Sequence, residues 1–219
     1  AGFVGLTLLL QYAFFPEYKI WMPVIYVMVV ASLVVGNFTA LKETNIVRML
    51  AYSSVAQGGF VLLPLTFLGA NGVMPVESVI QATVVYLFIY LMANLGAFGC
   101  IIAISRRTRS GELETYNGLG QREPFLAICL SIFLFSLAGI PPMAGWFAKF
   151  VMFLSALDVG TTGSVVKKKI AGVASVVAFV YYAGVVKRMW LEAPAEMKEV
   201  EDESRASGGL LVSSRTSVT

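Results

Sequence analysis

Histidine is absent from this 219-residue sequence, and cysteine occurs only at Cys100 and Cys129. Without an imidazole, the chain cannot form a His metal site, a His proton shuttle or a Ser-His-Asp triad. Two thiols are too few for a metal site, and both lie inside apolar runs, where a free cysteine packs as a small hydrophobic residue. We therefore expect neither a bound metal nor triad chemistry in this chain.

Charge is also scarce. Only 13% of the residues are charged and 58% are hydrophobic, with a mean hydropathy of +0.79. Such a chain cannot cover a water-facing surface, which excludes a soluble globular domain and a disordered chain, and it lacks the alternating strands of an outer-membrane barrel. The net charge of +3 is spread over short loops, so we expect no nucleic-acid partner. The composition predicts an all-α membrane protein, a polytopic bundle of transmembrane helices in a lipid bilayer.

The positions of the charges divide the sequence into six apolar segments, and about 20 apolar residues are needed to cross a bilayer. The predicted spans cover about residues 1–16, 20–41, 49–70, 78–105, 124–157 and 168–190, which make one bundle over 1–190, followed by a polar tail or linker at 191–219. The chain begins with Ala1, its first span is short and no signal peptide is present. We expect a fragment of a longer protein that begins inside a helix.

The fifth span is too long for one straight helix and too short for two. As a single helix, 124–157 would extend about 51 Å, against a hydrocarbon core of about 30 Å. Pro141 and Pro142 remove two backbone donors, and Gly139 and Gly145 loosen the chain on either side. The sequence predicts a discontinuous helix broken near 139–145, and broken helices of this kind recur at ion sites in transporters.

Lys149 follows this break and is the only charged residue deep inside a span. A Lys at the centre of a membrane helix costs about 2.5–3.5 kcal/mol on insertion scales. Either its stem runs along the helix and places the ammonium at the interface, or it faces the bundle interior and exchanges protons there. We favour the second, because eight uncharged residues separate Lys149 from Asp158.

Uncharged polar residues lie at depth in two other spans. Tyr86, Tyr90 and Asn94 are spaced by four, and this spacing predicts one stripe on a helix face that neighbours Lys149. Such residues either line a chain of waters or bond neighbouring helices together, and spacing alone favours the second. The full set of candidate proton-transfer residues is Lys149, Tyr86, Tyr90, Asn94, Tyr52, Ser53 and Gln57.

The basic residues in the loops predict an orientation. Alternate loops share one side of the membrane, and the side with more Lys and Arg is usually cytoplasmic. One side holds Lys42, Arg48, Arg106, Arg107, Arg109, Arg122, Lys187 and Arg188, and the other holds Lys19, Lys167, Lys168 and Lys169. We expect the first set to face the cytoplasm, with the run Lys167–Lys169 as a local exception.

Three motifs then resemble a known family. The run GNFTALKETNIVRMLAYSSVAQGGF (Gly36–Phe60) resembles a signature of antiporter-like membrane subunits. The run YNGLGQREP (Tyr116–Pro124), followed by SLAGIPPMAGWFAKF (Ser136–Phe150), resembles subunit N of the proton-translocating NADH:quinone oxidoreductase, respiratory complex I, which is equivalent to mitochondrial subunit 2. The resemblance covers nearly all of residues 1–190.

The resemblance implies a fourteen-helix antiporter-like fold, of which the last five spans here match helices nine to thirteen. It also implies a fragment cut at both ends, which lacks the essential Glu of helix five and the Lys residues of helices seven and eight. The Lys of the broken twelfth helix falls on Lys149. The chain departs from the family pattern at Val47, where a Lys is usual, and at Gln57, where a His is often found.

The implied function is a proton-translocating membrane-arm subunit, in which protons pass along buried lysine, polar side chains and water. NADH, FMN, iron–sulfur clusters and quinone would act in other subunits of the parent complex, so we expect no redox cofactor bound by this chain. Its partners would be other membrane-arm subunits, in a bacterial cytoplasmic membrane or else a mitochondrial inner or thylakoid membrane. A subunit of a multisubunit cation/proton antiporter and a purely structural scaffold remain as alternatives.

Overall fold

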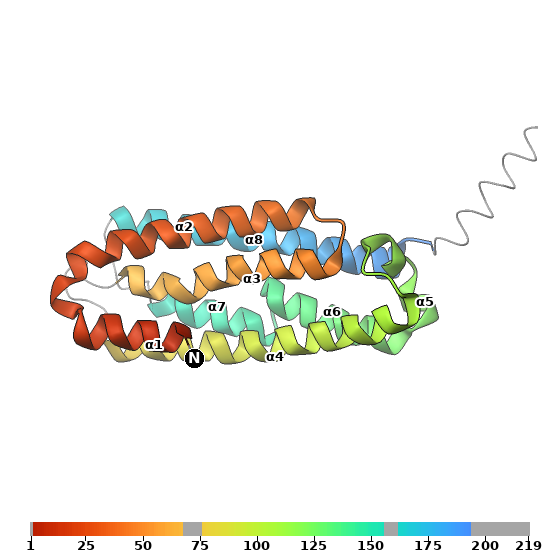
Figure 1. Cartoon of the computed structure of the whole chain (residues 1–219), viewed down its shortest axis with the longest axis horizontal. Helices are drawn as coiled ribbons and strands as arrows, with labels where there is room; N and C mark the ends of the chain where they lie inside the picture. The colour runs from red at the N-terminus through yellow and green to blue at the C-terminus, as the bar shows by residue number, and fades with distance from the viewer. Residues whose placement is uncertain (1, 68–75, 156–161, 194–219) are drawn as a thin grey trace, which may run out of the picture.

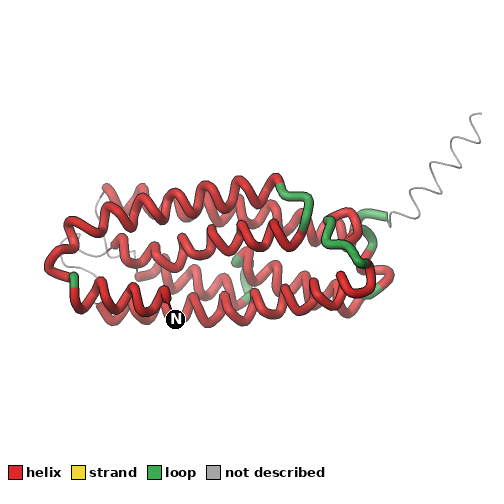
Figure 2. The backbone as a smooth tube through the Cα atoms, viewed as in Figure 1, coloured by secondary structure: helices red, strands yellow, loops and turns green. Residues whose placement is uncertain are grey.

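The protein is a bundle of helices that run along one common axis (Figures 1 and 2). The computed structural model describes residues 2–67, 76–155 and 162–193. The elements are α1 (Gly2–Leu8), the π-turn η1 (Leu9–Ala13), η2 (Phe15–Glu17), α2 (Tyr18–Lys42), α3 (Ile46–Leu62), η3 (Leu63–Phe67), α4 (Val76–Thr108), η4 (Leu113–Tyr116), α5 (Leu119–Arg122), α6 (Pro124–Ala138), α7 (Ala144–Ser155) and α8 (Thr162–Leu191). The predicted all-α membrane bundle is confirmed.

Among the residues that the structure describes, four helical stretches are long and apolar enough to cross a membrane, namely Phe15–Lys42, Ile46–Phe67, Glu77–Thr108 and Val165–Leu191. The helices α6 and α7 are shorter, with 15 and 12 residues. At about 1.5 Å per residue neither reaches across a core of about 30 Å, whereas the two in succession do. The discontinuous helix predicted from the double proline is therefore present.

Two predicted boundaries are wrong. The non-helical break covers 139–143, and Gly145 lies in the first turn of α7 rather than in the break. The last span begins at Thr162 rather than at about residue 168, so Lys167, Lys168 and Lys169, which the orientation argument counted among the loop residues, lie inside α8. Lysine is a good helix former, so a charged stretch does not by itself end a helix. The predicted ends of spans 49–70 and 124–157 and most of the tail lie outside the described residues.

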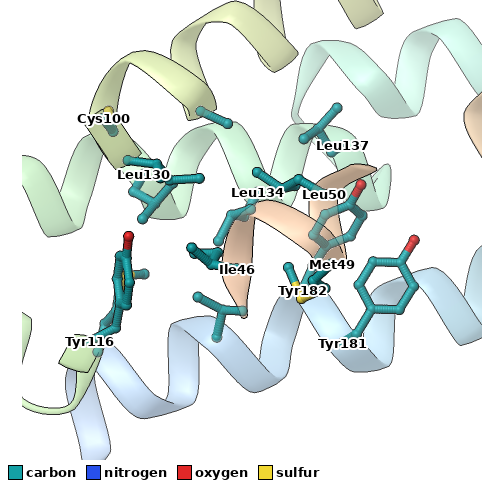
Figure 3. Packing of buried hydrophobic residues seen from close by; sticks show 14 of the residues in the cluster. Ile46, Met49, Leu50, Cys100, Tyr116, Leu130, Leu134, Leu137, Tyr181 and Tyr182 are labelled. Atoms are coloured by element: carbon teal, nitrogen blue, oxygen red, sulfur yellow. The ribbon is translucent and has the colours of Figure 1, made fainter. Parts of the chain in front are cut away.

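Close contacts between helices fix the bundle. A Cβ atom at Gly36 would lie 2.6 Å from the backbone nitrogen of Ala56, so glycine at this position lets α2 approach α3. One core cluster joins α3, α6 and α8, and Figure 3 shows Leu130 and Leu134 among its buried side chains. A second cluster surrounds Phe60 near the other end of α3.

One end of the bundle is tied together by loop backbone. The nitrogen of Ile46 donates to the carbonyl of Gly111 at 2.9 Å, and the nitrogen of Gly118 donates to the carbonyl of Arg188 at 3.2 Å. The end of α2, the start of α3 and the ends of α4 and α8 meet here (Figure 1). The larger set of basic residues therefore lies at one end, and which side of the membrane this end faces stays a prediction.

Candidate functional site

The break begins at a capped helix end. Gly139 ends α6 in the left-handed region, with φ of 84°. Its nitrogen bonds the carbonyl of Ser136 at 3.0 Å, and the nitrogen of Ile140 bonds the carbonyl of Phe135 at 3.2 Å, which together form a Schellman motif. The last four carbonyls of a helix have no partner inside the helix. Since this motif satisfies the first two, the carbonyls of the next two residues of α6 need donors from elsewhere.

Lys149 supplies one of these donors. It lies in the second turn of α7, and helical side chains tilt toward the helix N-terminus, so its ammonium reaches back to α6. Its Nζ lies 2.8 Å from the carbonyl oxygen of Ala138, 3.4 Å from that of Leu137 and 5.0 Å from the ring centroid of Phe60. The side chain is 6% exposed and points into the bundle. A cation at the C-terminal end of a helix is favoured by the helix dipole.

Gln57 on α3 supplies the second donor. Its Nε2 donates to the carbonyl oxygen of Leu137 at 3.3 Å, so this oxygen accepts from both Gln57 and Lys149. The hydroxyl of Tyr86 on α4 donates to Oε1 of Gln57. One backbone oxygen of α6 thus joins side chains from α3, α4 and α7 in one network.

Further hydroxyl groups lie along α3. Ser53 bonds the hydroxyl of Tyr182, and the hydroxyl of Tyr90 donates to Ser54 at 2.8 Å. Tyr182 was not among the residues predicted from the sequence, although a pair of tyrosines in the middle of an apolar span marks this position. Its neighbour Tyr181 donates to the buried Asn37 at 3.2 Å.

A small cavity of about 10 Å³, the space of roughly one water molecule, lies between α3, α4, α6 and α7. The polar residues in its lining are Gln57, Tyr86, Tyr90, Ser136 and Lys149. A water at this position would have the several polar partners that a buried water requires. The cavity therefore brings together four of the residues predicted from the sequence.

Both glycines beside the break allow close approach. A Cβ atom at Gly139 would lie 2.8 Å from Cδ of Lys149, so the lysine stem passes directly over this residue. A Cβ atom at Gly145 would overlap the carbonyl oxygen of Ser136, and the nitrogen of Gly145 donates to the Ser136 hydroxyl at 3.2 Å. The two glycines let α7 start against the end of α6.

Other predicted residues lie apart from this cavity. Tyr52 is 37% exposed on the outer face of α3, and Asn94 is half-buried on α4 but does not line the cavity. Pro141 and Pro142, joined by a cis peptide bond, are exposed and contribute to the break without lining the cavity.

A second partly buried lysine lies nearer the other end of the bundle. Lys167 on α8 donates to the carbonyl of Thr66, and its Nζ lies 5.4 Å from the ring centroid of Tyr26 and 5.7 Å from that of Phe67. The charge pattern placed this residue in a loop. The contacts instead make it a link between α2, η3 and α8.

The arrangement around Lys149 offers an ammonium, an amide and phenol hydroxyls in one network, and these groups can pass a proton with the help of a water. Within the residues that the structure describes, no three His, Cys, Asp or Glu side chains gather as a metal site would require.

Curated relatives of this chain are named as subunit 2 of NAD(P)H-quinone oxidoreductase. The chain is 40% identical over 198 residues to the chloroplastic NAD(P)H-quinone oxidoreductase subunit 2 of Nephroselmis olivacea. The aligned region covers 90% of this chain and 37% of the relative. It is 42% identical over 200 residues to NAD(P)H-quinone oxidoreductase subunit 2 of Synechocystis. Here the aligned region covers 91% of this chain and 36% of the relative. The chain thus spans little more than a third of the length of these curated relatives.

Solved membrane complexes contain similar chains. Respiratory complex I from Thermus thermophilus with bound aureothin contains a chain with a TM-score of 0.58 and 29% identity, over 78% of this chain and 36% of that one. A chain of the Mrp complex from Dietzia matches with a TM-score of 0.68 and 26% identity. The match covers 83% of this chain and 34% of that one. Residues 1–175 match the family model described as NADH:quinone oxidoreductase/Mrp antiporter, TM, and the chain belongs to this family of membrane proteins.

Proposed function

We propose that this chain is part of a proton-translocating membrane subunit of an NAD(P)H:quinone oxidoreductase complex, in which Lys149 carries the proton. The observation that carries the proposal is the buried Lys149 ammonium at the end of a broken helix, within reach of polar side chains and a water-sized cavity. Its relatives, named as subunit 2 of NAD(P)H-quinone oxidoreductase, support the same complex.

In the proposed mechanism, the two α6 carbonyls hold Lys149 in its charged form. The proton leaves Lys149 for a water in the cavity, whose lining also contains Tyr86, Tyr90 and Gln57. The hydroxyl of Ser53, which is hydrogen-bonded to that of Tyr182, continues the proposed proton path along α3. A change of charge near Lys149 would shift the balance between its two protonation states, which couples the site to redox chemistry elsewhere.

We also propose that the chain itself holds no redox centre. The absence of His and the placement of both Cys residues in apolar spans support this part of the proposal. NADH, FMN, iron–sulfur clusters and quinone would then belong to partner subunits of the membrane complex. We place the chain in a bacterial cytoplasmic membrane, with a thylakoid membrane as the alternative because its relatives include chloroplast and cyanobacterial proteins.

A subunit of a cation/proton antiporter is the second candidate, because the backbone also resembles a chain of the Dietzia Mrp complex. The two candidates differ in what drives the proton. An oxidoreductase subunit moves protons only while quinone is reduced, whereas an antiporter subunit exchanges them for a cation gradient without an electron donor.

The test measures proton translocation per electron in vesicles that contain the assembled complex. We expect Lys149→Ala to lower translocation about tenfold or more, since a positioned proton carrier is lost. Lys149→Arg retains a donor for the α6 carbonyls but does not release a proton, so it should assemble and still fail. The control is Lys187→Ala, which removes an exposed lysine of α8. Full pumping by both Lys149 variants would refute the proposal.

A further inference from the structure

The N-terminal part of α8 carries three consecutive lysines, Lys167–Lys169. These lysines put positive charge at the end of the bundle that is poorer in basic residues. Lys167 is held by its contacts with the Thr66 carbonyl and two aromatic rings. Lys168 and Lys169 make no ion pair within the described residues, and Lys169 is exposed.

Lys169 lies at one end of an apolar groove between α2 and α8. The groove has a volume of about 290 Å³. On α8 the lining residues are Lys169, Ile170, Val173, Ala174 and Val177, a spacing that places them on one helix face. Bulky side chains of α2, including Leu33 and Phe38, form the opposite wall.

The groove is built for an apolar chain. Its one amide, Asn37, is turned inward, where it donates to the Leu33 carbonyl at 2.8 Å and accepts from Tyr181. From Lys169 to Val177 the groove follows α8 for about 12 Å, at 1.5 Å per residue. Its volume is close to the lower limit of about 300 Å³ for pockets that bind small ligands. The groove therefore takes a narrow hydrocarbon chain along its length.

We propose that this groove binds one acyl chain of an anionic phospholipid, whose phosphate group pairs with Lys169. A transmembrane helix is the less suitable occupant, because helices pack closely in membranes through small residues, whereas the groove walls contain Leu, Phe, Ile and Val. Lys169 at the end of the groove selects a lipid with a negative headgroup over a neutral one. This proposal does not depend on proton translocation.

The first test compares headgroups. The protein is purified in detergent and mixed with phosphatidylglycerol or phosphatidylcholine of identical acyl chains, and lipid retention is measured by native mass spectrometry. We expect preferential retention of phosphatidylglycerol. A Lys near an anionic lipid surface contributes about fivefold, so Lys169→Gln should lower the preference by about fivefold. The control variant Lys187→Gln, which removes a charge at the far end of α8, should leave it unchanged.

The second test blocks the groove. Val173 and Val176 are each 64% exposed, but only Val173 lines the groove. We expect Val173→Trp to reduce phosphatidylglycerol retention and Val176→Trp to leave it as in the unmodified protein. Soluble glycerol phosphate should compete weakly, because it lacks the chain that fills the groove.

Three results would overturn the proposal. One is equal retention of the two lipids. Another is a lipid preference that survives both Lys169→Gln and Val173→Trp. The third is full displacement of the lipid by glycerol phosphate, which would assign Lys169 to a free phosphate instead.

Discussion

Gly139 has two structural roles that a single methyl group would disturb. Its φ of 84° is favourable for glycine only, and its missing Cβ leaves the space through which the Lys149 stem passes. We expect Gly139→Ala to destabilise the protein by about 1–3 kcal/mol, because the left-handed backbone is strained for alanine. Thermal unfolding in detergent measures this change.

The matched control is Gly99→Ala. A Cβ at Gly99 would meet no atom within 4 Å, and the residue lies inside α4. Alanine is favoured over glycine within a helix by about 0.5–1 kcal/mol, so this variant should be slightly more stable. Equal effects of the two substitutions would mean that the helix end at Gly139 is not specifically constrained.

Gln57 is the second residue on which the network depends. Gln57→Leu keeps a side chain of similar size but removes a donor to the Leu137 carbonyl and the acceptor of the Tyr86 hydroxyl. The Leu137 carbonyl keeps Lys149 as a donor, but the buried Tyr86 hydroxyl is left without its acceptor, which costs about 1–3 kcal/mol, so we expect lower stability and slower proton translocation. In contrast, Tyr52→Phe on the exposed face of the same helix should change stability by less than about 0.5 kcal/mol. Unchanged stability and unchanged proton translocation in Gln57→Leu would show that Gln57 is not part of the proton-transfer site.

At this scale the sequence predicts some site residues and not others, for geometric reasons. The isolation of Lys149 in an apolar span marked it as a candidate, and the structure places it inside the bundle, but its main partners are backbone carbonyls, which no residue type identifies. Asn94 was predicted from a four-residue spacing, yet eight residues make two full helical turns and a further rotation of about 80°. Asn94 is therefore rotated by about 80° from Tyr86 and does not line the cavity. Adjacent residues such as Tyr52 and Ser53 are about 100° apart, so one is exposed while the other is buried.

Among the elements, the contact between α6 and α7 depends on Gly145. A methyl group at this position would overlap the Ser136 carbonyl, which belongs to the backbone and cannot rotate away. We expect Gly145→Ala to separate the two half-helices, lower stability by about 1–3 kcal/mol and weaken the hold on Lys149. Gly184→Ala in α8, where a Cβ meets no atom within 4 Å, is the control and should be tolerated. Hydrogen exchange of the α6 end measures the effect, and protection equal to that of the control would contradict the expectation.

The double proline predicted a break, and the structure contains it. Its far boundary was wrong because Gly145 was taken as a sign of loosened backbone, whereas its role is close packing inside a helix. The start of α8 was wrong because charges were used as helix boundaries. A helix can continue past the membrane surface or place a lysine against aromatic rings, as Lys167 does.

For the whole molecule, the orientation in the membrane is the main prediction left by the charge pattern. Gln121 is exposed in the connection predicted to be cytoplasmic, and Glu17 is exposed at the opposite end of the bundle. In a protein whose two native cysteines are replaced by serine, Gln121→Cys should be shielded from an impermeant thiol reagent added outside intact cells. Glu17→Cys should be labelled. The reverse pattern would invert the orientation of every helix.

The oxygen atom of Leu137 receives bonds from α3 and α7, so the length of α6 is fixed by where this atom must point. One inserted residue between Pro124 and Leu137 would turn this oxygen by about 100° and move it about 1.5 Å along the helix axis, away from both donors. Insertions and deletions in α6 should therefore be rare among functional variants, which can differ there only by substitution.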